Sequence, residues 1–107
     1  MPSLRSFSLA LLLGTIPAAS ASASQAWWTW WRHSATPEGC VSDAQAAFAV
    51  AGLTGVSTST SSSAVSGHAG EYVAIAMCVD QVATLTVAGP EEATARALHD
   101  RVRGAWH

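Results

Sequence analysis

Residues 71–88 read EYVAIAMCVDQVATLTVA, and this stretch decides the fold. In residues 71–79 the larger apolar side chains alternate with alanine and cysteine, which is the period of a β-strand. In residues 82–88 apolar side chains alternate with threonine in the same period. Asp80 and Gln81 leave a connection of two residues, which is typical of a β-hairpin. The stretch therefore predicts two antiparallel strands, and the first is expected to be central because both of its faces are largely apolar.

A helix is expected on each side of this hairpin along the chain. Ser42 and Gln45 have the spacing of a capping box, which predicts a helix that begins at Asp43 and ends at Gly52. Its apolar positions have helical spacing: Ala44, Ala47, Phe48 and Ala51. Pro90 predicts the start of the second helix, because a missing N–H costs nothing at the first helical position. The expected inward stripe of that helix is Ala95, Leu98 and Val102, with Trp106 beyond it.

Two further segments are expected to extend the sheet. Residues 56–61 alternate Val or Thr with Ser and predict a polar edge strand, whereas the serines through Ser63 indicate a flexible loop. Residues 24–39 contain four tryptophans that favour a strand but show no clean alternation: Trp27, Trp28, Trp30 and Trp31. The expected fold is α+β, a two-layer sandwich in which an antiparallel sheet of three to four strands carries two helices on one face.

The pattern leaves open which face of the central strand the helices cover. One face is small and allows helices to approach closely: Ala74, Ala76 and Cys78. The other face is larger: Val73, Ile75 and Met77. If the helices cover the small face, the larger one needs cover from the tryptophan segment, a second copy of the chain or a partner. The reverse arrangement fits the pattern equally well.

The N-terminus has the features of a secretory signal peptide. Arg5 supplies positive charge, residues 7–13 are mostly apolar, and small residues with an A-x-A pattern follow. Residues 1–23 are therefore expected to be removed, which leaves residues 24–39 as a Trp-rich segment and residues 40–107 as a small α+β domain. The apolar run is too short for a membrane anchor, which needs about 20 residues. We expect an exported protein, periplasmic or secreted, with no transmembrane anchor.

Cys40 and Cys78 are the only cysteines. An oxidising compartment favours their pairing, and one intramolecular disulfide is predicted. It closes a loop of about 38 residues, for which the chain-entropy model gives about 4 kcal/mol of stabilisation. A redox or metal-binding pair is disfavoured because there is no C-x-x-C spacing and no neighbouring cationic cluster.

Three segments also carry a resemblance. They are Cys40 before an alanine-rich helix, the strand at residues 71–78, and residues 87–90, Val-Ala-Gly-Pro, before the final helix. This arrangement resembles small exported bacterial proteins of unknown function that have a single disulfide, and it is similar to small ferredoxin-like domains. The resemblance covers most of the chain after residue 23. It implies a fold and a location, and it supplies no catalytic residue.

The charge pattern disfavours polyanionic partners. The formal net charge is −2, the charges are scattered, and the chain contains no lysine. Neutralising phosphates requires clustered Lys and Arg, so no nucleic acid partner is expected. Anionic membrane surfaces are disfavoured for the same reason.

The tryptophan cluster is the candidate binding surface: Trp27, Trp28, Trp30 and Trp31. Exposed indoles can stack on sugars, insert at a lipid interface or anchor another protein. The alternative is that the rings pack across an otherwise bare sheet face. We expect a non-enzymatic binding or interaction protein whose partner is a protein or an envelope component, with a homodimer as one form. No catalytic residue, metal site or cofactor is expected.

The alternative function is a periplasmic enzyme or metal-handling protein that uses His68 and nearby acids, of which Glu71 is the nearest in sequence. The four histidines have no recognised ligand spacing: His33, His68, His99 and His107. The serines lie in a repetitive stretch without a G-x-S-x-G turn, so no activated nucleophile is indicated.

Overall fold

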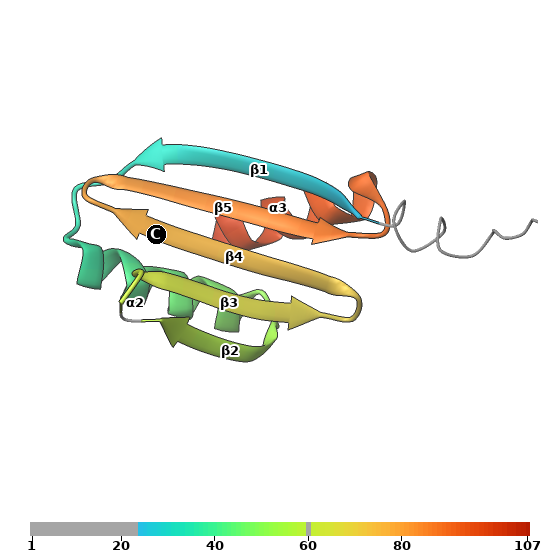
Figure 1. Ribbon diagram of the computed structural model, residues 1–107, viewed down its shortest axis with the longest axis horizontal. Helices are drawn as coiled ribbons and strands as arrows, with labels where there is room; N and C mark the ends of the chain where they lie inside the picture. The colour runs from blue at the N-terminus through green and yellow to red at the C-terminus, as the bar shows by residue number, and fades with distance from the viewer. Residues whose placement is uncertain (1–23, 60) are drawn as a thin grey trace, which may run out of the picture.

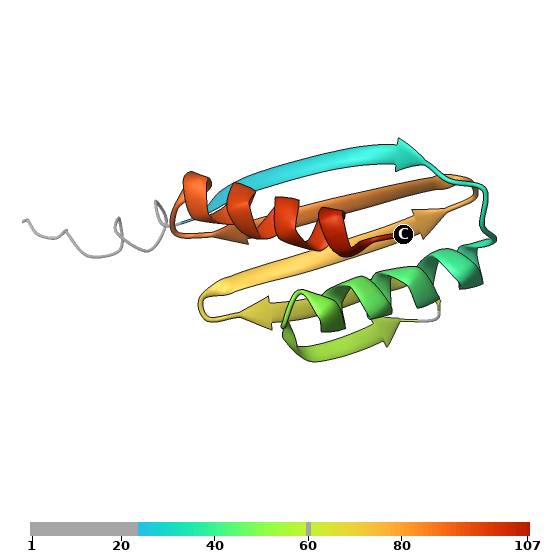
Figure 2. The same ribbon diagram turned by 180° about the vertical axis from the view of Figure 1, so that it is seen from behind.

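The computed structural model describes residues 24–59 and 61–107. Its elements, in chain order, are β1 (Gln25–Arg32), α2 (Pro37–Val50), β2 (Thr54–Ser59), β3 (Ala64–Ala69), β4 (Tyr72–Val79), β5 (Val82–Gly89) and α3 (Glu92–Ala105). The strands form one antiparallel sheet in the order β1-β5-β4-β3-β2, and both helices lie on the same side of it (Figures 1 and 2). Neither helix has the length and apolar character needed to cross a membrane. The expected signal peptide, residues 1–23, lies outside the described residues.

The sheet has five strands, so the expectation of three to four strands was too low. The additional strand is β3, which begins at Ala64 directly after the serines that sequence analysis interprets as a loop. Ser63 takes a positive φ of 51° in the turn before β3. The chain reverses there, so that β3 pairs with both β2 and β4. The relation to ferredoxin-like domains is not confirmed, because no strand follows α3 in the described part of the chain.

The hairpin of β4 and β5 confirms the prediction from residues 71–88. Val79 pairs with Val82 across a turn of two residues. Asp80, the first residue of that turn, has a φ of 52°, in the left-handed region that Asp tolerates better than most residues. The register of β4 and β5 therefore follows from the turn and the alternation together.

The helix α2 begins at Pro37, so the predicted start at Asp43 was wrong. Thr36 is the N-cap, and its hydroxyl oxygen accepts a main-chain N–H of the first turn at 3.1 Å. Pro37 then occupies the first helical position, where no N–H is needed. Ser42 and Gln45 lie inside the helix, and the Gln45 amide donates to the Thr58 hydroxyl of β2 instead of capping α2.

The helices cover the small-residue face of the sheet. The buried side chains of β4 are Ala74, Ala76 and Cys78. These small residues let the helices approach closely, and in β3 a Cβ added to Gly67 would lie 3.0 Å from the Phe48 ring of α2. The predicted apolar stripes are buried: Ala44, Ala47, Phe48 and Ala51 along α2, and Ala95, Leu98 and Val102 along α3. The core therefore fills one side of the sheet only.

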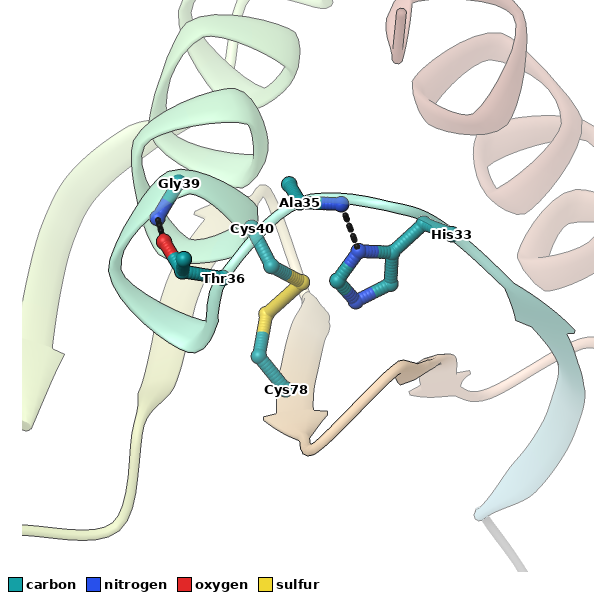
Figure 3. Close-up of a disulfide and its surroundings, with 6 residues drawn as sticks. All are labelled: His33, Ala35, Thr36, Gly39, Cys40 and Cys78. Atoms are coloured by element: carbon teal, nitrogen blue, oxygen red, sulfur yellow. Dashed lines mark hydrogen bonds between the residues drawn. A yellow bond between two sulfur atoms is a disulfide. The ribbon is translucent and has the colours of Figure 1, made fainter.

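The predicted disulfide is present between Cys40, in the first turn of α2, and Cys78, near the end of β4, with 6.0 Å between the Cα atoms (Figure 3). Cys40 is 1% exposed and Cys78 is 2% exposed. The bridge joins a helix to the central strand and lies inside the core.

Candidate functional site: the open face of the sheet

The sheet face opposite the helices, called the open face below, is built by alternate residues of all five strands. Cross-strand pairing aligns these residues in rows. One row contains Trp28, Thr86, Ile75, Ser66 and Ser57, and the next contains Trp30, Thr84, Met77, Ala64 and Ser59. No described helix or loop packs on this face (Figures 1 and 2). Its larger side chains are consequently exposed: Trp28 60%, Trp30 58%, Val79 57%, Ile75 41% and Met77 40%.

Strand β1 divides the tryptophans of the candidate binding surface between the two sides of the sheet. Trp27 and Trp31 are half-buried on the helix side. The guanidinium of Arg96 lies 4.5 Å from the Trp27 ring centroid, and that of Arg103 lies 3.9 Å from the Trp31 ring centroid. Because both arginines belong to α3, these cation–π contacts hold that helix against β1. The other two tryptophans lie on the open face, so only half of the cluster is available to a partner.

The open face carries no carboxylate among the residues that the structure describes. The acidic residues lie in helices, in turns or at a helix cap: Glu38, Asp43, Glu71, Asp80, Glu91, Glu92 and Asp100. Arg32, at the end of β1, and His68, in β3, are the titratable groups on this face. A surface rich in aromatic residues and Met and poor in charge has the composition of the core of a protein interface.

The structure does not bring His68 and Glu71 together with further ligands. His68 is exposed, and its ring packs near Gly55 of β2, where an added Cβ would lie 3.3 Å from His68 Cδ2. Glu71 lies in the β3–β4 turn, where it lines an open hollow of about 430 Å³ with Tyr72 and Glu91. Within residues 24–59 and 61–107, no group of three His, Cys, Asp or Glu side chains could hold a metal ion.

A second hollow of about 330 Å³ lies between α2 and the end of the sheet that carries β2. Its lining residues are Glu38, Val41, Gln45, Thr58 and Ser63. A carboxylate, an amide and hydroxyls offer hydrogen bonds there, but the lining contains no histidine or cysteine to activate a nucleophile. Carboxylates line both hollows, and neither lining contains a histidine or a cysteine.

His99 is a buried residue to which sequence analysis assigns no role. It is 3% exposed, its Nε2 lies 2.8 Å from the Thr29 hydroxyl, and its Nδ1 lies 3.0 Å from Asp100 Oδ1. An acid, an imidazole and a hydroxyl in this order resemble a hydrolytic relay. However, the hydroxyl lies between β1 and α3, and neither hollow reaches it. We interpret these hydrogen bonds as a structural link between β1 and α3.

The burial of His99 could have been predicted from the sequence. The inward stripe of α3 is Ala95, Leu98 and Val102, and His99 falls four positions after Ala95 on the same face. A histidine in such a stripe must find hydrogen-bond partners when it is buried. The partner on β1 could not be named from the sequence, because it depends on the β1–β5 pairing.

His33 lies beside the disulfide (Figure 3). Its Nδ1 accepts the Ala35 main-chain N–H at 3.1 Å, and its Nε2 is buried without a hydrogen-bond partner in the described part of the chain. An imidazole next to a cysteine at a helix N-terminus is an environment that can activate a thiol. Since both sulfurs are buried, the bridge acts as a structural staple here.

A scan against protein-family models matches none of them, and searches of curated proteins and of solved structures give no significant match. Only the residues of the chain itself, above all those of the open face, therefore indicate a function.

Proposed function

We propose that the protein is an exported, non-enzymatic binding module that receives a protein partner on its open face. The observation that carries this proposal is the exposure of two tryptophans and the apolar side chains of β4 on one surface that has no carboxylate among its described residues: Trp28, Trp30, Ile75 and Met77. Large apolar side chains exposed together on one face mark interaction sites, and here Thr84 and Thr86 of β5 lie between the two groups. Burying it against a partner is favourable by about 25 cal/mol for each Å² of apolar area.

The polar groups of the open face favour a protein over a sugar or a lipid surface. The polar groups of the open face are mostly Ser and Thr hydroxyls, and its described residues offer no carboxylate or amide to orient a stacked sugar. Anionic bilayers attract clusters of Lys and Arg, and the face has only Arg32 among its described residues. The core of a protein interface, in contrast, is depleted in charge.

Export belongs to the same proposal. It rests on the signal-like features of residues 1–23 and is supported by the disulfide, which persists in oxidising compartments. The resemblance to small exported proteins with one disulfide points the same way. A stapled core with one side of its sheet uncovered suits a small domain that works by binding outside the cytoplasm.

Site-specific photo-crosslinking in producing cells tests the proposal. A benzophenone amino acid in place of Trp30 probes the open face, and the same amino acid in place of Val50, which is 76% exposed on α2, is the matched control. We expect a discrete protein adduct from position 30 and none from position 50. Adducts to lipid or glycan, equal labelling from both positions, or the absence of any adduct would each contradict the proposal.

A further inference from the structure

We infer that the partner on the open face is a second copy of this chain, packed face to face about a twofold axis that runs along β4. This inference rests on the proposed binding function and names the occupant of the site. Three properties of the open face support it: the distribution of large and small side chains across the strands, the positions of the charges, and the area.

In two rows of the open face the β1 edge is bulky and the β3–β2 edge is small. In the row through Ile75, the β1 position is Trp28 and the last two positions, on β3 and β2, are serines. The row through Met77 is similar, with Trp30 on β1 and with Ala64 and Ser59 at the other edge. In the row through Val73 the order is reversed, from Ala26 on β1 to His68 on β3. β4 is the middle strand of the five, so in the first two rows bulky and small residues lie on opposite sides of it.

A twofold rotation about β4 makes this surface complementary to itself. The rotation places β1 of each copy over β2 of the other and leaves β4 facing its own copy. The indoles of each protomer then fill the space above the serines of its partner, and Ile75 and Met77, near the middle of β4, meet their symmetry mates. Two sheets packed in this way lie about 10 Å apart with their strands within about 30° of each other. A flat ligand would contact the indoles of β1 and leave the serines of β2 and β3 uncovered.

The charges do not oppose this pairing. Arg32 lies on the β1 edge, so the rotation moves the Arg32 of the partner to the opposite edge of the assembly. His68 lies on β3 and is carried over β5, whose open-face residues are uncharged. At these positions no like charges meet. Because the face has no carboxylate among its described residues, no acid is buried.

The area of the open face is sufficient for a stable pair. The strands are about 4.8 Å apart; three have eight residues, about 26 Å, and two have six residues, about 20 Å, so they cover about 570 Å² of sheet in each copy. If the whole face is covered in both copies, the pair removes about 1,200 Å² from water, which is at the lower bound of specific, stable interfaces. Two closely apposed sheets with interdigitating side chains form the second hydrophobic layer that one copy lacks.

Opposite charges introduced at the axis test the inference. Met77→Glu and Met77→Lys each place two like charges against each other in the dimer, whereas in a single copy position 77 is 40% exposed and admits a charge. Native mass spectrometry of the oxidised protein, produced from the full-length chain in a bacterial host, measures the outcome. We expect a dimer for the unmodified protein and for the control Val50→Glu. Each variant at position 77 is expected to dimerise more than about a hundredfold less tightly.

Mixing the two variants gives the most specific result. Because position 77 faces its own symmetry mate, the Glu and Lys variants together are expected to form a heterodimer of intermediate mass, although each alone is monomeric. If a charge at position 77 prevents folding, seen as loss of the disulfide or of the circular dichroism spectrum, Trp30→Ser replaces it. Removing this anchor is expected to weaken the dimer about thirtyfold.

Three results would overturn the inference: a monomer at every concentration up to the solubility limit, a dimer that survives Met77→Glu, or a dimer lost equally with Val50→Glu. A dimer that survives Met77→Glu would show that its interface lies away from the open face, for example at the free edge of β1. A monomer that still forms a crosslink from position 30 to a different protein would leave the proposed binding function intact. A protein that gives neither dimer nor crosslink would refute both.

Discussion

His99 shows how a single buried polar side chain holds two elements together. Its two ring nitrogens are both engaged, one by the Thr29 hydroxyl of β1 and one by the Asp100 carboxylate on its own helix. The first of these bonds crosses 70 positions of sequence. It therefore links the N-terminal strand to the C-terminal helix with a specificity that apolar packing alone does not give.

Thr29→Val tests this tie. The substitution keeps the shape of the side chain but leaves the buried Nε2 of His99 without its partner, which is expected to destabilise the protein by about 1–3 kcal/mol. Denaturant unfolding of the oxidised protein measures the effect. Thr86→Val on the open face is the control and is expected to stay within about 0.5 kcal/mol of the unmodified protein. Equal effects of the two substitutions would show that the hydroxyl of Thr29 contributes nothing specific.

Gly89 is a second position where one residue controls its surroundings. The Tyr72 ring occupies the space that a Cβ at Gly89 would need, and the Tyr72 hydroxyl accepts the main-chain N–H of Glu91, the N-cap of α3, at 3.1 Å. Tyr72 thus covers the end of β5 and supports the start of the last helix.

Gly89→Ala is therefore expected to displace the Tyr72 ring and to cost about 1–3 kcal/mol of stability. Gly104→Ala in α3 is the matched control, because a Cβ there meets no atom within 4 Å. That control is expected to stabilise the protein by up to about 1 kcal/mol, since Ala is the better helix former. Thermal unfolding followed by circular dichroism separates the two, and a neutral Gly89→Ala would contradict the close approach.

At the scale of elements, α2 offers a direct comparison between a predicted and an observed helix start. Thr36→Ala removes the N-cap and is expected to cost about 0.5–2 kcal/mol. Ser42→Ala removes the residue that sequence analysis expects to be the cap. Because Ser42 lies inside the helix, its replacement is expected to be neutral or slightly stabilising. Urea unfolding of both variants measures the change in the free energy of unfolding. A larger loss for Ser42→Ala than for Thr36→Ala would indicate that α2 begins at Asp43.

The elements that could be predicted are those whose pattern is local. Residues 71–88 alternate with period two, and the stripes of both helices repeat with helical spacing, so the hairpin and the buried helix faces follow from the sequence. β3 could not be predicted, because it contains small and polar residues and its position depends on Gly67 fitting under Phe48. The start of α2 was misplaced because Ser42 and Gln45 form a capping-box pattern by coincidence.

The candidate site was only half predictable for a similar reason. The four tryptophans of residues 27–31 are all large and apolar, so the sequence contains no signal for which pair is covered. That choice depends on Arg96 and Arg103 reaching from α3 to Trp27 and Trp31. The face of β4 that carries Ile75 was likewise undecided until the helices were placed.

At the scale of the whole molecule, the disulfide joins the two layers. Replacing both cysteines with alanine is expected to reduce the free energy of unfolding by about 2–5 kcal/mol, a large share of the stability of so small a domain. Denaturant unfolding measures the loss. Because both sulfurs are buried, we also expect dithiothreitol to reduce the folded protein slowly and to act quickly once denaturant is added. Fast reduction without denaturant would contradict the burial of the bridge.

The pairing of β1 with β5 also sets the order in which the molecule can assemble. β1 is the first of the described strands to be synthesised, yet Gln25 pairs with Gly89 in β5, the last of them. Until β5 and α3 have emerged, the indoles of β1 have neither a neighbouring strand nor a helix to cover them. Distant pairings of this kind form late and slowly, so β3, β4 and β5, which are adjacent in sequence, are expected to associate first. Residues 25–32 therefore stay without their strand partner until residues 82–89 have been made, and a chain that is still unfolded at this stage is compatible with the proposed export.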